Sequence, residues 1–272
     1  MRLDNAIERA FRSERAVMVL SLAALTALAW IYLFWDAGRM AAMAPGGDAA
    51  KMPGMEMPMA AAGLSFGAVL MVFTMWSVMM VGMMVPSVAP TILLYANMAR
   101  RGREAGKTLP AAWVFTAGYL AAWTGFSLVV TLLQLALSQF GLISPMMAST
   151  NAWLTGGLLI VAGIYQWLPL KDVCLEFCRS PLAVLIGHWR PGAKGAFIMG
   201  FENGLYCVGC CWALMLLLLA GGVMNLGLVA LVAGFVIVEK LLPFGQHTAR
   251  AAGLLLIALG LWTLLGSASF LT

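Results

Sequence analysis

The chain has 272 residues, of which 62% are hydrophobic and only 10% are charged, and its mean hydropathy is +0.94. Roughly a quarter of the residues of a soluble domain are charged, so this composition excludes an ordinary soluble protein and indicates a polytopic membrane protein. The formal net charge of +5 follows from basic loops on one side of that membrane and does not indicate nucleic-acid binding.

Seven apolar runs approach the length of about 20 residues that crosses a hydrocarbon core of about 30 Å. The first follows a basic leader, but it ends in the aromatic belt WIYLFW, so we expect a retained span and not a secretory signal. The polar segments between the runs are short, which predicts one all-α membrane domain over residues 1–272. The seven expected spans lie near residues 17–35, 64–86, 109–137, 152–169, 196–220, 226–243 and 249–268.

Basic residues concentrate in every second connection between these runs. Fourteen Lys and Arg residues flank one set of ends, and only Arg39 and Lys51 lie on the other. Because Lys and Arg concentrate in cytoplasmic loops, the N-terminus is predicted in the cytoplasm and the C-terminus outside. We therefore expect a multi-pass protein of the bacterial inner membrane.

The first external loop, residues 36–63, is rich in Ala, Gly, Pro and Met, and is expected to be disordered. Its segment MPGMEMPM places four methionines in water, where an apolar side chain is unusual. A thioether is a soft neutral ligand that suits Cu(I), so we interpret the loop as a metal-capture segment; compositional drift is the alternative. The four methionines are Met52, Met55, Met57 and Met59.

Methionine also forms a stripe along the second run. Met71, Met75, Met79 and Met83 are spaced by four residues, so each step winds only about 40° around a helix. Pro86 and Pro90 are expected to kink or end the helix just past the stripe. Such a stripe most often serves helix packing, with metal contact as the alternative. The candidate ligands are Met79, Met80, Met83 and Met84.

The cytoplasmic loop at 170–195 contains Cys174 and Cys178, which share one face if the segment is helical. Two such thiolates can bind one soft metal ion. All five cysteines fall between 174 and 211, and an odd number on the reducing side argues against structural disulfides. Asp172 and His188 are weaker candidate partners.

The fifth run holds three further cysteines near its middle. Cys207 precedes Cys210 and Cys211 by three and four residues, so all three thiols point to one side of a helix. Asn203 lies on the same ladder, which Met199 and Met215 extend at either end. Metal binding or thiol redox chemistry explains this clustering better than plain packing does.

Two charged positions are candidates for a supporting role around the thiols. Glu202 lies in the same run, and a charged group within a membrane is expected to have a partner. Lys240, next to Glu239 at the end of the sixth run, and Arg179 are the partners considered. A snorkelling or ion-paired carboxylate is the alternative for Glu202.

The segments WSVMMVGMMVPSVAPTILLY, AGIYQWLPLKDVCLEFCRSPL, GFENGLYCVGCCWALMLLLLAGGVMNL and VIVEKLLP together carry a family resemblance. In this order they resemble a bacterial family of predicted metal-binding integral membrane proteins, a domain of unknown function sometimes labelled copper chaperone. The resemblance spans roughly residues 66–266 and implies an inner-membrane location and copper as ligand. The positions that it covers include the four candidate methionines, Pro86, all five cysteines and the Glu239–Lys240 pair.

Three classes of function follow. The first is an inner-membrane protein that transports or delivers Cu(I), with a copper enzyme or a soluble copper chaperone as partner. The second is a membrane thiol–disulfide oxidoreductase, which the spacing of Cys207 and Cys210 permits. The third is an assembly or scaffold subunit. No phosphate-binding loop or haem-attachment motif occurs, so we expect no nucleotide, no haem and, in the first class, no catalytic residue.

Overall fold

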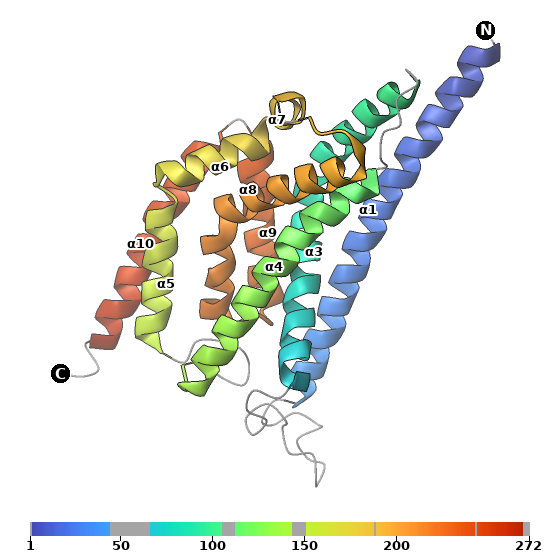
Figure 1. Ribbon diagram of the computed structural model, residues 1–272. Coiled ribbons are helices and arrows are strands. Elements are labelled where there is room, and N and C mark those ends of the chain that lie inside the picture. Colours follow the sequence, from blue (N-terminus) through green and yellow to red (C-terminus); the bar gives the residue numbers. More distant parts are fainter. Residues whose placement is uncertain are drawn as a thin grey trace.

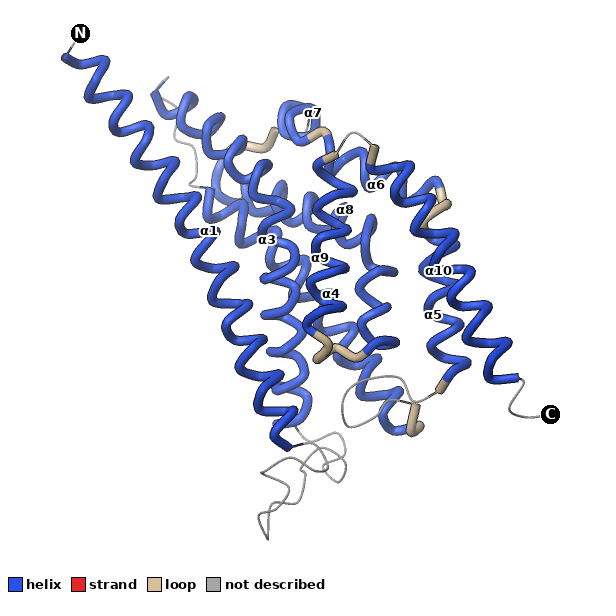
Figure 2. The backbone as a smooth tube through the Cα atoms, turned by 180° about the vertical axis from the view of Figure 1, so that it is seen from behind, coloured by secondary structure: helices blue, strands red, loops and turns tan. Residues whose placement is uncertain are grey.

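The computed structural model describes residues 2–43, 66–104, 112–142, 151–187, 189–242 and 244–268. Throughout these ranges the regular structure is helical, with no strand (Figure 2). In the bundle, α1 lies along one edge and α5 with α10 along the opposite edge (Figure 1). The helices are α1 (Arg2–Met43), α3 (Phe66–Glu104), α4 (Ala112–Gln139), α5 (Ala152–Tyr165), α6 (Pro169–Arg179), α7 (Pro181–Gly187), α8 (Gly192–Gly221), α9 (Leu226–Leu241) and α10 (Gly245–Ala268).

Each of the seven predicted apolar runs contains a helix, but these helices are not equally long. Five helices, α1, α3, α4, α8 and α10, are long and apolar enough to cross a membrane. The short helices α5 and α6 meet at 66° and make a sixth candidate if they are counted as one broken span. With 16 residues, α9 reaches about 24 Å, less than a hydrocarbon core of about 30 Å. The chain thus has five or six candidate spans of a multi-pass membrane protein, where the sequence predicted seven.

Two predicted boundaries differ from the structure. The first helix continues to Met43, so the start of the predicted loop 36–63 is helical; the loop methionines Met52, Met55, Met57 and Met59 lie outside the described residues. Helix α3 passes through Pro86 and Pro90 and ends only at Glu104, so the prolines do not end the helix, and the kink that the sequence offered as the alternative stays a prediction. Proline is tolerated inside a membrane helix because neighbouring helices and side chains can hydrogen-bond to the backbone groups that it leaves unpaired.

Glycines bring the backbones of α4 and α8 into direct contact. A Cβ on Gly118 would collide with the Phe197 carbonyl oxygen, and one on Gly200 would collide with that of Phe115. Small residues at helix crossings are the usual means of close packing in membranes. The two helices are therefore fixed against each other along the stretch that leads to the cysteines of α8.

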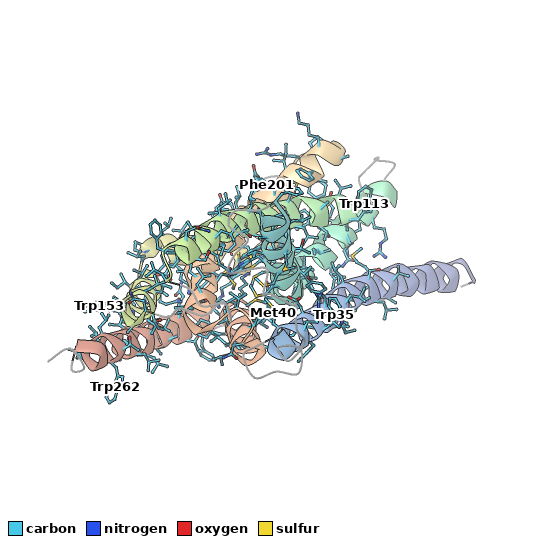
Figure 3. The ribbon with its side chains drawn as sticks, turned by 90° about the horizontal axis from the view of Figure 1, so that it is seen from below. Trp35, Met40, Trp113, Trp153, Phe201 and Trp262 are labelled. Atoms are coloured by element: carbon cyan, nitrogen blue, oxygen red, sulfur yellow. The ribbon has the colours of Figure 1, made fainter. Side chains whose placement is uncertain are left out.

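The helix ends next to basic segments gather at one end of the bundle, which we call the basic end. It holds the start of α1, the end of α3 and the short helices α6 and α7 (Figure 1). This grouping agrees with the alternation of basic residues along the sequence; the side of the membrane that the basic end faces stays a prediction. Large aromatic side chains such as Trp113, Trp153 and Trp262 point outward from the bundle, 72%, 58% and 79% exposed (Figure 3). Such an apolar outer surface suits contact with lipid.

Candidate metal centre

The three cysteines of α8 lie on its inner side, as their spacing predicted. Cys207, Cys210 and Cys211 are each 1% exposed. The thiols of Cys210 and Cys211 donate hydrogen bonds to the Cys207 carbonyl oxygen at 3.1 and 2.8 Å, which is the contact that steps of three and four residues along a helix allow. The predicted ladder is buried as well, with Met199, Asn203 and Met215 lining the interior.

The amphipathic helix α6 brings a fourth cysteine to this cluster. The Sγ atoms of Cys178 and Cys210 are 4.0 Å apart, although the two residues belong to different helices. With metal–thiolate bonds of about 2.3 Å, two sulfur ligands are about 3.8 Å apart when the sulfur–metal–sulfur angle is tetrahedral. They are about 4.6 Å apart when the two sulfurs and the metal lie on a line. The observed separation falls between these limits, so one ion fits between the two sulfurs without moving either helix.

The fifth cysteine, Cys174, lies one turn before Cys178 on α6 and contacts the backbone of α8. A Cβ on Gly209 would lie 2.8 Å from the Cys174 Sγ atom, so this glycine makes room for the thiol. All five cysteines are free thiols, which agrees with the expectation that none forms a structural disulfide. Cys174 and Cys178 both keep partial exposure, whereas the thiols of α8 do not.

A buried lysine faces the thiol cluster from α9. Lys240 is only 7% exposed, and its ammonium group donates hydrogen bonds to the Cys207 Sγ atom at 2.8 Å and to the Ser87 hydroxyl at 3.2 Å. Tyr119 of α4 approaches the same sulfur, with 3.0 Å between its hydroxyl oxygen and the Cys207 Sγ atom. Cys207 is thus held by side chains from two other helices, and a cationic group stands beside the thiols.

A second buried lysine is neutralised by Glu239. The Lys171 ammonium of α6 forms an ion pair with the Glu239 carboxylate and donates to the Gln166 side-chain oxygen. Both charged groups are almost completely buried, at 0% and 1% exposure. Because Lys171 precedes Cys174 and Cys178 on α6, the ion pair ties the cysteine-bearing helix to α9. Glu239 and Lys240 are adjacent in sequence but bind different partners, Lys171 and Cys207.

Glu202 does not belong to this buried network. Its carboxylate pairs with Arg190 at 2.7 Å, and both side chains are about as exposed as surface residues, at 35% and 45%. The partners that the sequence suggested were wrong, since Lys240 binds Cys207 and Arg179 donates to the Leu242 carbonyl oxygen. The alternative interpretation, an ion-paired carboxylate near the bundle surface, describes Glu202 correctly.

The methionine stripe lies in the core of the bundle. Its four candidate ligands are at most 1% exposed, whereas Met71 at the start of the stripe is 52% exposed. Two hydrogen bonds join α3 to the surroundings of the thiols: the Met84 carbonyl oxygen accepts from Tyr119 at 3.4 Å, and the Ser87 hydroxyl accepts from Lys240. Metal binding by a thioether therefore stays a prediction. The four buried methionines are Met79, Met80, Met83 and Met84.

A cavity of about 530 Å³ between α6 and α8 reaches Cys174, the outermost of the five cysteines. Cys174 of α6 lines it, as do Met199 and Asn203 of α8. Glu202 also lines the cavity, which places the surface ion pair with Arg190 at its wall. The cavity is therefore a path by which a small ligand can reach Cys174, one helical turn from Cys178.

Asp172 and His188 are the harder ligands that the sequence offered to this cluster. Among the described residues, no three His, Cys, Asp or Glu side chains converge on a point where an ion could sit. Asp172, a weaker candidate, pairs instead with Arg250 at 3.6 Å, and His188 lies outside the described residues. Structural zinc takes four such ligands, whereas soft thiolates select Cu(I). The facing pair Cys178 and Cys210 thus suits a soft ion with few ligands.

Sequence reasoning missed two residues of this site. Lys171 is one of the fourteen basic residues that the sequence places at one set of ends, and it lies on the same helical face as Cys174 and Cys178, at steps of three and four residues. That spacing is the signal by which it could have been found. Tyr119 stands in an apolar run without any charged neighbour, and no pattern in the sequence marks it.

The fold and its surface define a multi-pass helical membrane protein with a buried thiol cluster. Residues 73–263 match the model of a family described as PpoB2, copper chaperone, and the chain belongs to this family. The match includes all five cysteines and Lys171, Glu239 and Lys240. No curated protein and no solved structure matches the chain.

Proposed function

We propose that the chain binds one Cu(I) ion between Cys178 and Cys210 and delivers it to a partner protein. The observation that carries this proposal is the separation of 4.0 Å between the two sulfur atoms. Thiolates prefer Cu(I) among the metals of the cell interior, and two facing sulfurs supply a low coordination number. The family description, copper chaperone, favours delivery as the fate of the ion.

The charges around the cluster support a monovalent ion. Two thiolates and one Cu(I) carry one net negative charge, which a buried site tolerates only beside a positive group. Lys240 supplies that positive charge, because Lys171 is already neutralised by Glu239. A divalent ion between the same thiolates would leave the charge of Lys240 without a counter-charge.

The cavity between α6 and α8 supplies the route to the site. Cys174 lines the cavity and is partly exposed, so it receives Cu(I) first and passes it along α6 to Cys178. Exchange between neighbouring thiolates avoids releasing a bare ion inside the protein. The loop methionines outside the described residues remain the proposed capture segment on the opposite side, which an importer would use.

Competition with a Cu(I)-specific chelator tests the site. The purified full chain is titrated in a reducing buffer, and the C178S and C210S variants are compared with the matched control C211S, whose buried thiol donates its hydrogen bond to the carbonyl oxygen of Cys207 in its own helix. We expect one tightly bound Cu(I) in the wild type and in C211S, and a loss of at least tenfold in affinity in C178S and C210S. Wild-type affinity in all four proteins would refute the proposal.

Delivery and import make different predictions for the cell. An importer raises the total copper content of cells, whereas a delivery protein changes only the copper loading of its partner enzyme. Copper accumulation with and without the protein separates the two. An unchanged total with reduced activity of a copper enzyme would support delivery, and a lower total in the deletion strain would support import.

The facing pair also favours a second candidate, thiol–disulfide exchange. Oxidation of Cys178 and Cys210 would form one disulfide and release two electrons and two protons to an external disulfide or quinone. Thiol trapping in growing cells decides between the candidates: a disulfide that forms and disappears supports exchange, and thiols that stay reduced and are protected by copper support metal binding.

A further inference from the structure

The cavity beside Cys174 is much larger than a copper ion requires. Its volume is about 530 Å³, whereas the ion is smaller than a water molecule, whose share of the liquid is about 30 Å³. Pockets that bind small organic molecules have volumes of about 300 to 1,000 Å³. The cavity therefore has room for the molecule that carries the ion as well as for the ion itself.

Two buried polar side chains in the wall of this cavity have no partner. Thr91 of α3 and Asn203 of α8 line it and are only 6% and 7% exposed. Among the residues that the structure describes, neither the Thr91 hydroxyl nor the Asn203 amide forms a hydrogen bond. Other threonines, such as Thr116 and Thr124, donate to a carbonyl oxygen of their own helix. Because a buried polar group without a partner is costly, these two groups are placed to bind a polar ligand.

The rest of the cavity wall indicates the chemistry of that ligand. The rings of Phe177 and Tyr206 stack with their centroids 4.0 Å apart and form an apolar wall, to which Phe115 contributes. Glu202 is the charged side chain of the lining, and Arg190 neutralises it. A wall without an unpaired positive charge does not attract a phosphate, whereas a hydroxyl and an amide can hydrogen-bond to the amide groups of a peptide-like molecule.

We propose that the cavity binds a small peptide-like thiol, of the chemical class of glutathione, which carries Cu(I) to Cys174. This inference rests on the proposed function, since it names the donor of the ion that Cys178 and Cys210 bind. Helices α6 and α7 both line the cavity and lie at the basic end of the bundle (Figure 1). That end is predicted to face the cytoplasm, where glutathione keeps thiols reduced.

The transfer itself is an exchange of thiolate ligands at Cu(I). The bond between copper and the sulfur of the carrier breaks, and a bond between copper and the Cys174 sulfur forms. The proton of the Cys174 thiol passes to the carrier, which leaves as a free thiol. Copper stays in the Cu(I) state throughout, so the exchange requires neither an oxidant nor a reductant. Thr91 and Asn203 hold the amide groups of the carrier while its sulfur faces Cys174.

Binding of S-methylglutathione to the copper-free, purified full chain tests the cavity apart from its copper chemistry, because this probe has no thiol. Equilibrium dialysis compares N203L and T91V with the control T124V, whose side chain is exposed and bonds to its own helix. We expect saturable binding to the wild type and T124V, and binding at least fivefold weaker to N203L and T91V. T91V keeps the shape of the side chain, so it decides the matter if N203L elutes abnormally on size exclusion. Binding that does not saturate, or that is equal in all four proteins, would overturn the proposal.

The rate of copper transfer separates this inference from the proposed function. With Cu(I)–glutathione as donor, we expect transfer to T91V to be at least tenfold slower than transfer to T124V, and the equilibrium affinity for Cu(I) to be the same in both. Equal rates, with copper bound as in the wild type, would overturn the inference and leave the proposed function intact. Wild-type copper affinity in C178S/C210S would overturn the proposed function, whereas saturable binding of S-methylglutathione to that variant would still support the cavity as the site of the thiol.

Discussion

Replacing Lys240 with methionine removes the positive charge beside the thiols and keeps a side chain of similar length. The ammonium lies 2.8 Å from the Cys207 Sγ atom, and the Cu(I) complex on Cys178 and Cys210 adjoins that sulfur. At an effective dielectric constant of about 20, opposite unit charges about 4 to 6 Å apart attract each other by about 3 to 4 kcal/mol. The cost of burying Lys240 offsets part of this stabilisation. We therefore expect K240M to weaken Cu(I) binding by about 1.4 to 2.8 kcal/mol, or about 10- to 100-fold.

The same substitution should reverse the preference between metals. A divalent ion and two thiolates form a complex with no net charge, and without Lys240 no unpaired positive charge stands beside that complex. K240M is therefore expected to bind Zn²⁺ more tightly while it loses affinity for Cu(I). Competition titrations with chelators specific for each ion measure both changes, and K240R, which keeps the charge, serves as the matched control. S87A removes only the hydrogen bond at 3.2 Å and should change the preference little. An unchanged ratio of the two affinities in K240M would refute the charge argument.

Three further variants test other parts of the account. C174S is expected to slow Cu(I) uptake in stopped-flow experiments at least tenfold and to leave the equilibrium affinity for Cu(I) unchanged. The reason is that Cys174 lies on the proposed route and not at the proposed site. A loss of affinity would contradict this role. E239Q leaves the buried Lys171 charge unpaired and should lower the free energy of unfolding by about 3 to 5 kcal/mol. Denaturation in mild detergent measures this change. Wild-type stability would show that the ion pair does not stabilise the fold. E202Q breaks an exposed ion pair with Arg190 and should change stability by less than about 1 kcal/mol; a larger loss would mean that Glu202 supports the core.

Patterns within a single helix were predicted well from the sequence. The spacing of Cys207, Cys210 and Cys211 placed their thiols on one buried side, and the structure confirms it. Composition likewise indicated a helical membrane protein. These features depend on helix periodicity and on the cost of exposing backbone groups to lipid, and both are properties of a short stretch of chain.

Contacts between helices could not be predicted in the same way. The proximity of Cys178 to Cys210 depends on the bend of 66° between α5 and α6, which lays α6 against α8. Lys171 finds Glu239 only because that bend brings α6 to the end of α9. For Glu202, sequence reasoning considered Lys240 and Arg179 as partners, although Arg190 is nearer in sequence and forms the ion pair. A single sequence contains no record of such neighbours.

X-ray absorption at the copper edge tests the central claim most directly. The purified full chain is loaded with one equivalent of Cu(I), and its spectrum is compared with that of the C178S/C210S double variant. Because the two sulfurs already face each other at 4.0 Å, the account predicts a low-coordinate copper with sulfur ligands only, and the loss of that spectrum in the double variant. Copper bound through nitrogen or oxygen, or the same sulfur spectrum in the double variant, would contradict it.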